Sequence, residues 1–229
     1  MLDPASIKAL TFDVFGTVVD WRGSIARDLG DYFAARKPPI ERDWAIFADA
    51  WRGRYQPAME RVRSGNRGFV KLDVLHRENL REVLDEFGIA GLSEGERDHL
   101  NRVWHRLDPW PDSVPGMTRV KRRYALASLS NGNVSLIVAM AKRAGIPWDT
   151  VLGAETARAY KPQPEAYLRA AEMLSLAPAQ CLMVAAHNND LAAAAKCGFR
   201  TAFIRRPNEI PGRPTISRPI PASISTAPT

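Results

Sequence analysis

The sequence is short of cysteine, since its 229 residues contain only Cys181 and Cys197. Two cysteines without metal-ligand spacing exclude a disulfide-stabilised scaffold and a cysteine metal site. The sequence also lacks an apolar run long enough to span a membrane, and its first residues lack the basic and apolar blocks of a signal peptide. We therefore expect no membrane association and, as the default, a cytoplasmic location.

No stretch is dominated by charge of one sign. The 32 Lys and Arg and the 25 Asp and Glu residues give a formal net charge of +7, and the basic residues are spread among acids rather than clustered. This distribution argues against nucleic acid as a partner, because nucleic-acid binding uses a contiguous basic patch. The excess positive charge does favour attraction of small anionic substrates toward a cleft.

Hydrophobic residues are present in ordinary proportion, 45%, and their spacing divides the chain into two regions. In the first region, apolar positions at helical spacing cover 25–35, 44–62, 70–87 and 94–107. From residue 116 onward helices alternate with strands, the helices at 117–123, 134–144, 164–174 and 191–196, and the strands at 124–129, 150–153, 181–184 and 201–204. Such alternation predicts an α/β fold with a Rossmann-like, doubly wound parallel sheet.

The two regions predict a core interrupted by an insertion. We expect residues 1–18 and 108–206 to form the Rossmann-like catalytic core, and residues 19–107 to form a helical cap above the carboxyl edge of its sheet. The stretch 207–229 is rich in Pro, Ser and Thr and has little apolar periodicity. We expect it to be a largely disordered tail.

The most informative segment is 7–17, an apolar run that ends at Asp13. It reads as a buried strand, after which Gly16 allows a sharp turn and Thr17 can hydrogen-bond locally and hold the loop. In open α/β sheets ligands bind at the carboxyl edge, so Asp13 is a candidate nucleophile, base or metal ligand. An aspartate that merely caps a helix is the alternative.

Three later strand ends carry polar residues as well. Ser130-Asn131-Gly132 offers hydroxyl, amide and backbone N–H groups that suit an anion, although a plain helix N-cap is the alternative for Ser130. Lys161 lies in a loop before a predicted helix, where a solvated lysine is the commoner outcome. Asp190 follows the strand at 181–184, where a helix-capping acid is the simpler interpretation.

Taken together, the order Asp13, Ser130, Lys161, Asp190 resembles the four motifs of the haloacid dehalogenase superfamily, hydrolases whose nucleophile is an aspartate. The resemblance covers nearly the whole chain up to about residue 206, and it includes a helical insertion at the place where the superfamily has its cap. It implies that the four side chains converge on one pocket.

Two departures from the phosphatases of this superfamily concern the chemistry. Phe15 stands where those enzymes carry a second acid, which protonates an alcohol leaving group. An aromatic ring cannot donate this proton, but a halide ion usually leaves without protonation, so Phe15 fits carbon–halogen chemistry. At the fourth motif Asp190 stands alone where those enzymes usually carry paired acids that help to bind Mg²⁺. We therefore expect no metal or other cofactor, although Asp13 and Asp190 could still hold a weak cation site.

Within the superfamily the chain looks like the type II 2-haloacid dehalogenases, which act without metal. Their Asp-x-[Tyr/Phe]-Gly-Thr pattern is matched at 13–17, Ser-Asn-Gly at 130–132, and Tyr-Lys-Pro followed by Tyr at 160–162 and Tyr167. In that family a cap arginine helps to hold the departing halide, and Trp51-Arg52 matches it in order and context. Arg22 and Tyr55 are secondary candidates, and a surface charge on a helix is the alternative for either arginine.

The resemblance implies that Asp13 attacks C2 of a small anionic halogenated carboxylate, expels halide and forms an aspartyl ester that water hydrolyses to a 2-hydroxy acid. Ser130 would hold the substrate carboxylate, Arg52 and Asn131 the halide, Lys161 would keep Asp13 ionised, and Asp190 would orient the water. The implied catalytic residues are Asp13, Thr17, Arg52, Ser130, Asn131, Lys161, Tyr167, His187 and Asp190. The implied substrate contacts are Val14, Phe15, Arg22, Trp51, Tyr55, Ser130 and Asn131.

The chain departs from the best-known members of the family in two places. Those enzymes carry Ser-x-Asn before the last acid, whereas this chain has Ala185-Ala186-His187. We expect His187 to take over that role, as a second base or as a donor to fluoride; a merely packed imidazole is the alternative. The family also usually continues after 205–207 into another strand and helix, where this chain has only the Pro-rich stretch.

Two other functions stay open from the sequence. One is a Mg²⁺-dependent phosphatase or phosphonate hydrolase of the same fold, for which Phe15 and the absence of an identifiable cap lysine are unfavourable. The other is a non-catalytic binding protein, which the retention of all four motifs disfavours. The resemblance also makes a homodimer plausible, and it leaves the preferred halogen, the chain length and the strictness for the S enantiomer undetermined.

Overall fold

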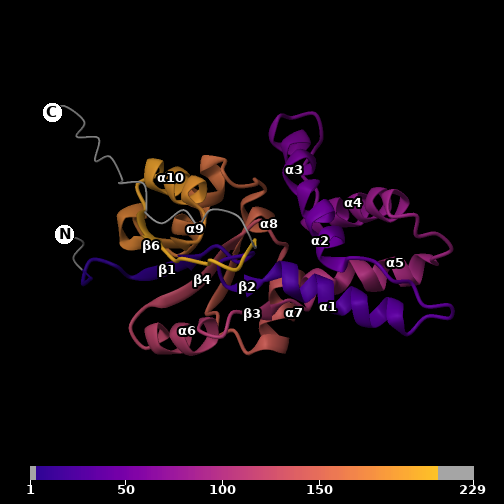
Figure 1. Ribbon diagram of the computed structural model, residues 1–229. Helices are drawn as coiled ribbons and strands as arrows, with labels where there is room; N and C mark the ends of the chain where they lie inside the picture. The colour runs from indigo at the N-terminus through magenta and orange to yellow at the C-terminus, as the bar shows by residue number, and fades with distance from the viewer. Residues whose placement is uncertain (1–3, 211–229) are drawn as a thin grey trace.

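The computed structural model describes residues 4–210, and within them one parallel sheet forms the centre of the core, beside the helices α1 to α5 (Figure 1). Its strand order is β5(Thr150–Gly153), β4(Ala125–Ser130), β1(Ala9–Phe12), β6(Cys181–Ala185), β7(Arg200–Phe203). The buried strand β1 is central, with Ala9 opposite Ala125 on one side and Cys181 on the other. The carboxyl ends of β1, β4 and β6 therefore share one edge, which is where Asp13 and the later motifs begin.

Helices cover both faces of this sheet. Side chains alternate along β1, so Ala9 packs against α9(Pro164–Met173) and α10(Asn188–Lys196), while Leu10 faces α6(Ser113–Lys121) and α7(Val134–Ala144). The short helices α8(Ala154–Ala157) and η2(Pro178–Gln180) complete the connections. The predicted α/β fold with a doubly wound parallel sheet is confirmed.

A helical insertion follows the first strand (Figure 1). It consists of α1(Trp21–Ala34), α2(Trp44–Gly53), α3(Tyr55–Arg63), α4(Leu72–Glu86), α5(Glu94–Asn101) and the 3₁₀ helix η1(Arg102–His105). Its apolar interior is continuous with that of the core: the rings of Phe15, from the loop after β1, and Trp104, from η1, meet edge to face with centroids 5.6 Å apart. The cap helices are thus packed directly onto the loop that follows Asp13.

An antiparallel pair of short strands joins the insertion to the core. β2(Val19–Asp20) and β3(Asp108–Pro109) pair at the two points where the chain enters and leaves the insertion. Strands of two residues carry no alternation that a sequence pattern could show. These two strands, and the four-residue α8, could therefore not be predicted from the sequence.

Several predicted helix boundaries are wrong. The single helix expected at 44–62 is two helices that meet at Arg54, whose N–H bonds back to the carbonyl of Trp51, and Pro57 cannot donate to the carbonyl of Gly53 in a continuous helix. The helix expected at 94–107 ends at Asn101 and tightens into η1. The helix expected at 117–123 spans Ser113–Lys121.

The last described residues also differ from the prediction. Residues 207–210 form a turn and a bend in which Glu209 is hydrogen-bonded to Trp21 at the start of α1 and to His187 after β6, so the expected disorder is wrong for them. The rest of the predicted tail, 211–229, lies outside the described residues.

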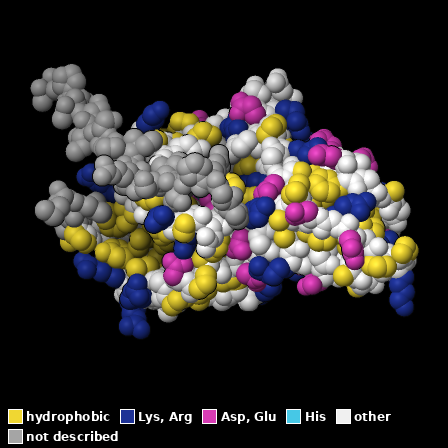
Figure 2. All heavy atoms as spheres, in the orientation of Figure 1, with side chains coloured by type: hydrophobic (Ala, Val, Ile, Leu, Met, Phe, Trp, Pro, Cys, Tyr) yellow, Lys and Arg dark blue, Asp and Glu magenta, His cyan; other side chains and the backbone are white. Residues whose placement is uncertain are grey.

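Two further properties bear on partners. None of the helices within residues 4–210 is both long and apolar enough to cross a membrane. On the face shown in Figure 2, Lys and Arg side chains are scattered among Asp and Glu, and they do not form a basic stripe of the kind that tracks nucleic acid.

Candidate active site

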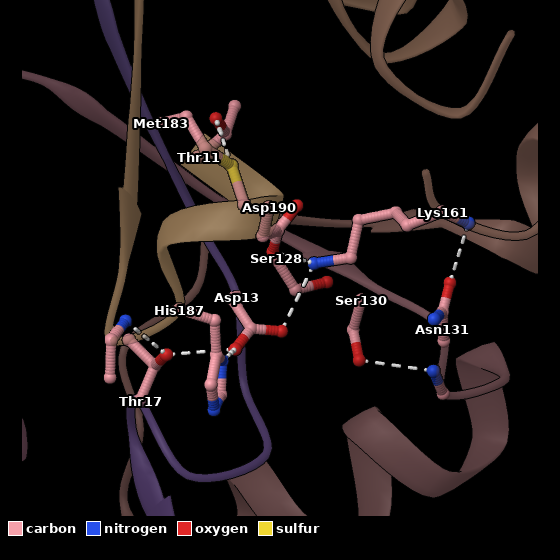
Figure 3. Close-up of polar contacts among 12 residues, drawn as sticks. Thr11, Asp13, Thr17, Ser128, Ser130, Asn131, Lys161, Met183, His187 and Asp190 are labelled. Carbon is pink, nitrogen blue, oxygen red and sulfur yellow. Dashed lines mark hydrogen bonds and ion pairs between the residues drawn. The ribbon is translucent and has the colours of Figure 1, made fainter. Parts of the chain in front are cut away.

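Four chain segments bring the predicted polar residues together at the carboxyl edge of the sheet (Figure 3). Asp13 follows β1, Asn131 follows β4, Lys161 lies in the loop before α9, and Asp190 lies in the first turn of α10. An acid in that turn is favoured by the helix dipole. A cavity of about 630 Å³ opens over this edge. Its lining includes nine predicted residues: Asp13, Phe15, Arg52, Tyr55, Asn131, Lys161, Tyr167, His187 and Asp190.

Lys161 holds the centre of the site. Its ammonium nitrogen lies 3.0 Å from Oδ1 of Asp13 and 2.5 Å from Oδ2 of Asp190, and all three residues are buried. Its backbone N–H donates to Oδ1 of Asn131 at 2.8 Å, and Tyr167 Oη donates to the other oxygen of Asp190 at 2.6 Å. Each charged group of this cluster is therefore held by another, which fixes the direction in which Asp13 points.

The charges of this cluster set the ionisation of Asp13. Burial alone raises the pKa of a carboxyl, but the nearby Lys161 charge and the bonds from His187 and Thr17 hold the pKa of Asp13 far below its ordinary value. Burial lowers the pKa of Lys161, and the two carboxylates more than reverse this. Burial and the Asp13 charge raise the pKa of Asp190 despite Lys161. Asp13 is consequently an ionised carboxylate in a partly enclosed site.

Thr17 ties the loop after β1 to the end of β6. Its hydroxyl donates to Oδ2 of Asp13 at 2.8 Å and accepts the backbone N–H of Ala186 at 2.9 Å. Gly16, between them, has a φ of +83°, a conformation that favours glycine. Thr17 itself does not line the cavity. It holds the carboxylate of Asp13, which does.

His187 lies between two carboxylates. Its Nδ1 is 3.0 Å from Oδ2 of Asp13, and its Nε2 is 3.0 Å from Oε1 of Glu209. Burial lowers the pKa of the imidazole, but the hydrogen bonds and charges of Asp13 and Glu209 raise it to about 10. The ring therefore carries both protons at neutral pH when Asp13 is a free carboxylate.

Arg52 occupies an aromatic pocket. Its guanidinium carbon lies 3.9 Å from the ring centroid of Tyr55, 5.5 Å from that of Trp21 and 5.8 Å from that of Phe15. Its Nη1 is buried and has no hydrogen-bond partner within residues 4–210. An unpaired buried donor is costly, so this nitrogen is suited to an anion that enters the cavity.

Two residues expected to contact substrate, Ser130 and Val14, do not line the cavity in this structure. The hydroxyl of Ser130 accepts the backbone N–H of Gly132 at 3.0 Å and is fully buried. Val14 is also fully buried, with its side chain in the hydrophobic core. Ser130 is not the N-cap of α7 either, because that position belongs to Asn133.

Two cap residues are likewise engaged elsewhere. The indole N–H of Trp51 donates to the carbonyl of His76 at 3.0 Å, and its ring is buried in the cap. Arg22 forms a two-pronged ion pair with Asp49, both bonds 2.7 Å long. Neither residue lines the cavity in this structure, and their contact with substrate stays a prediction.

Sequence reasoning missed several residues of the site. Glu209 is a lone acid in a Pro-rich stretch and carries no pattern. The cavity lining also includes Gln56, Glu60 and Arg63 from α3, and Pro162, Gln163 and Asn189 from the core. Arg63 reaches the core through a hydrogen bond to the backbone carbonyl of Lys161. Such a bond to the backbone leaves no signal in the sequence, so only the position of Arg63 on α3 could have indicated it.

The acids of the site do not form a larger cluster. Residues 4–210 contain no group of three or more His, Cys, Asp or Glu side chains arranged to hold a metal ion. Between Asp13 and Asp190, the two carboxylates predicted to allow a weak cation site, stands the ammonium group of Lys161.

The fold and this set of strand-end residues define a hydrolase with an aspartate at the end of its first strand. The model of the haloacid dehalogenase-like hydrolases matches residues 7–198, and the chain belongs to this family. Among solved structures it is similar to the defluorinating L-2-haloacid dehalogenase Rha0230, with 52% identity, a TM-score of 0.87, and coverage of 91% of this chain and 86% of the other.

Two further relatives are also named 2-haloacid dehalogenases. The (S)-2-haloacid dehalogenase 4A of Burkholderia cepacia is 27% identical over 90% of this chain and 86% of its own length. The L-2-haloacid dehalogenase of Xanthobacter autotrophicus, solved with chloropropionic acid covalently bound, is 25% identical, with a TM-score of 0.75 over 86% of this chain and 77% of that one. The resemblance stated from the motifs is confirmed.

Proposed function

We propose that the protein removes halide from short 2-haloalkanoic acids by hydrolysis and releases 2-hydroxy acids. The observation that carries this proposal is an ionised Asp13, held by Lys161, in a cavity that Arg52 also lines with a guanidinium whose buried Nη1 has no partner among the described residues. A nucleophilic carboxylate and a cation for the departing halide are the two groups that such a displacement needs. The likeness to enzymes named for this reaction supports the same conclusion.

In the first step an oxygen of Asp13 forms a bond to C2 of the substrate as the carbon–halogen bond breaks. The halide departs with the bonding electrons, C2 is inverted, and the product is an ester between Asp13 and the alkanoate. Arg52 stabilises the departing halide, and the amide of Asn131 offers a second donor. Lys161 keeps Asp13 ionised for the attack.

In the second step water attacks the carbonyl carbon of the Asp13 ester. The bond from that carbon to the alkanoate oxygen breaks, the 2-hydroxy acid leaves, and the Asp13 carboxylate is restored. Asp190 orients the water, and the Asp190 carboxylate is itself held in place by Lys161 and Tyr167. Overall one water is consumed, and one proton and one halide ion are released.

His187 fits the second step better than the first. An in-line displacement puts the halide on the side of C2 opposite the attacking oxygen. Because His187 is hydrogen-bonded to the attacking carboxylate itself, it lies on the wrong side to donate to fluoride. His187 was expected to act either as a second base or as a donor to fluoride. We therefore propose that it acts as the base.

Phe15 is the position that separates this reaction from phosphate-ester hydrolysis. Its ring is buried against Tyr55 and Trp104, so it supplies no proton for an alkoxide leaving group. We propose that no metal takes part, since Lys161 Nζ stands between the two available carboxylates. Residues 19–107 act as the cap in this proposal, and they close the halide side of the cavity through Arg52 and Tyr55.

The test is halide release from (S)-2-chloropropionate, fluoroacetate and chloroacetate, with and without EDTA, beside a generic phosphate ester. We expect halide release that EDTA and added Mg²⁺ leave unchanged, and no phosphate release. Chelator-sensitive phosphate release without halide release would instead establish the metal-dependent phosphatase. Binding of haloacids without turnover would establish a binding protein.

A single turnover in heavy-oxygen water tests the covalent route. In the proposed mechanism the isotope enters Asp13 first and reaches product only in a later cycle, because the oxygen given to the first product comes from the carboxylate. Label appearing directly in the first product would show that water, not Asp13, attacks C2.

Two statements about the protein's setting are proposals as well. We propose a cytoplasmic location as the default expectation, and a homodimer from the family resemblance. Sedimentation of the purified protein tests the second, and a mass of one chain at all concentrations would contradict it.

A further inference from the structure

The segment that follows β7 crosses the loop after β1 and is attached to it. Arg206 donates through Nε to the backbone carbonyl of Thr17 at 2.9 Å and pairs through Nη1 with Asp112 at 2.6 Å. Three residues later, Oε1 of Glu209 accepts the indole N–H of Trp21 at 3.1 Å. The Glu209 side chain is therefore held in place from the cap, while its backbone is held to the core through Arg206.

Room for this carboxylate exists because residue 16 has no side chain. A Cβ placed on Gly16 would lie 2.0 Å from Oε1 of Glu209, so a side chain at this position would displace the carboxylate. The carboxylate is thus fitted against the backbone of the loop that carries Asp13. It is only partly exposed, and its two oxygens lie 3.0 and 3.1 Å from Nε2 of His187.

The contact matters because of what it does to the two ring nitrogens. A carboxylate on Nε2 keeps a proton there, so a neutral His187 must carry its lone pair on Nδ1. Nδ1 is the nitrogen that faces Asp13, 3.0 Å from Oδ2. Among the described residues, Glu209 is the carboxylate that selects this tautomer, since Asp13 is on the other nitrogen.

We propose that Glu209 is a positioning residue that makes His187 a base only after Asp13 carries the ester. The proposal rests on the function proposed above. While Asp13 is a free carboxylate, both ring nitrogens donate to carboxylates and His187 is an imidazolium. When Asp13 becomes a neutral ester, one of the two charges that stabilise the imidazolium is gone, and the Nδ1 proton is released to solvent.

Hydrolysis of the ester then consumes one water, and His187 relays one of its protons. The lone pair of Nδ1 takes a proton from the attacking water as the water oxygen bonds to the ester carbon. The bond between that carbon and the alkanoate oxygen breaks, and the imidazolium gives its proton to the departing alkoxide. The remaining proton of the former water leaves the new Asp13 carboxyl, which returns as a carboxylate, and His187 is protonated again. Glu209 forms and breaks no covalent bond.

The experiment separates the two steps by rapid quench and intact-protein mass measurement with (S)-2-chloropropionate. In Glu209→Ala we expect Asp13 to be alkylated at a rate within a few-fold of the wild type, while ester hydrolysis slows by about 10- to 100-fold, the size of effect seen when a side chain that orients another is removed. The ester then accumulates on Asp13. Glu209→Gln keeps an acceptor for Nε2 but not the charge, and we expect an intermediate rate.

The pH profile supplies a readout that a merely structural role would not move. Ester hydrolysis requires neutral His187, and the Glu209 charge favours the imidazolium. In Glu209→Gln the rising limb of the ester-hydrolysis rate should therefore move to lower pH, by about one unit or more for the loss of a close opposite charge. Asp112→Asn is the matched control, because it removes a carboxylate that holds the same segment through Arg206 without contact to His187; it should keep the wild-type rate and pH profile.

Each outcome decides the proposal. Unchanged ester hydrolysis in Glu209→Ala, or an equal slowing of both steps with an unmoved pH profile in Glu209→Gln, overturns it. Loss of the ester-hydrolysis rate in Asp112→Asn as well would assign the effect to the segment rather than to Glu209. Failure of the proposed function looks different: no ester forms on Asp13 in the wild type or in His187→Asn, where it should accumulate.

Discussion

Lys161 Nζ lies 3.0 Å from Oδ1 of Asp13, although 148 residues separate them in the chain. Both side chains are buried, and the same nitrogen also contacts Asp190. Removing one member of a buried ion pair leaves an uncompensated charge, which costs far more than the intact pair contributes. The site therefore depends on this lysine both for its chemistry and for its stability.

We predict that Lys161→Met inactivates the enzyme. Without the ammonium group, the burial that raises the pKa of Asp13 is opposed only by His187 and Thr17, so less of the nucleophile is ionised at neutral pH. We expect halide release to fall at least about 100-fold and the unfolding free energy to fall by about 3 kcal/mol or more, the range for a broken buried pair. Steady-state halide assays and urea unfolding measure the two effects.

Lys71→Met is the control for this substitution. Lys71 pairs with Glu155 on the surface, with more than half of its side chain exposed, and such pairs contribute little. Activity should stay within about twofold, and stability within about 1 kcal/mol. Equal losses in the two variants would mean that the Lys161 pair has no special role.

Arg52 provides the second prediction. In Arg52→Met the aromatic pocket keeps an apolar occupant but loses the unpaired donor, and we expect halide release to fall by about 100- to 1000-fold, as for other preorganised donors. The loss should be larger with fluoroacetate than with bromoacetate, because fluoride concentrates its charge and leaves least readily. The rates of halide release by the wild type and by Arg52→Met, measured separately with each substrate, give this difference.

Arg22→Met is the companion variant. Arg22 was a secondary candidate for the same role, but its guanidinium is committed to Asp49 and lies outside the cavity lining. Its removal should change halide release by no more than a few-fold on either substrate. A strong, halide-dependent loss in Arg22→Met would move the leaving-group site to α1.

Tyr167 provides a third prediction, about the water step. Its hydroxyl donates to Asp190 at 2.6 Å, a hydrogen bond to a charged group. Such bonds contribute about 1.5–3 kcal/mol, so Tyr167→Phe should slow ester hydrolysis by about tenfold or more. Tyr160→Phe removes a buried hydroxyl that donates to the backbone carbonyl of Val70 instead, and its ester hydrolysis should stay near that of the wild type. Equal rates of ester hydrolysis in the two variants would contradict a role for Tyr167 through Asp190.

Much of the fold and the centre of the site could be predicted from local patterns. An apolar run that stops at Asp13, followed by regular alternation of helices and strands, is enough to place Asp13, Lys161 and Asp190 at one sheet edge, since parallel strands share their carboxyl ends. The same reasoning could not decide where a side chain turns once it reaches that edge. Ser130 shows this, because its hydroxyl closes a local turn rather than facing the cavity.

The rest depends on contacts that leave no trace in local sequence. Arg52 gains its surroundings from α1, α3 and the loop after β1, which meet only in the folded chain. Glu209 sits in a stretch whose composition indicates disorder, and only its fit against Gly16 and Trp21 identifies it as part of the site. A lone residue held by tertiary contacts has no periodicity to read.

The last prediction concerns stability and pH, and it follows from the position of His187 between Asp13 and Glu209. The folded-state pKa of His187 is raised to about 10, above the value of about 6.5 for an unfolded chain. A group of this kind stabilises the fold fully below its unfolded pKa, and the contribution is lost as the pH rises through the folded value. Between about pH 6 and pH 10 the wild type should therefore lose more unfolding free energy than His187→Asn, which has no such proton to release. Urea unfolding of both proteins across that range measures the difference, and the contributions of lysines and tyrosines cancel because both proteins share them. Parallel curves would mean that the two carboxylates do not hold an imidazolium in the folded protein, and the timing proposed for ester hydrolysis would lose its basis.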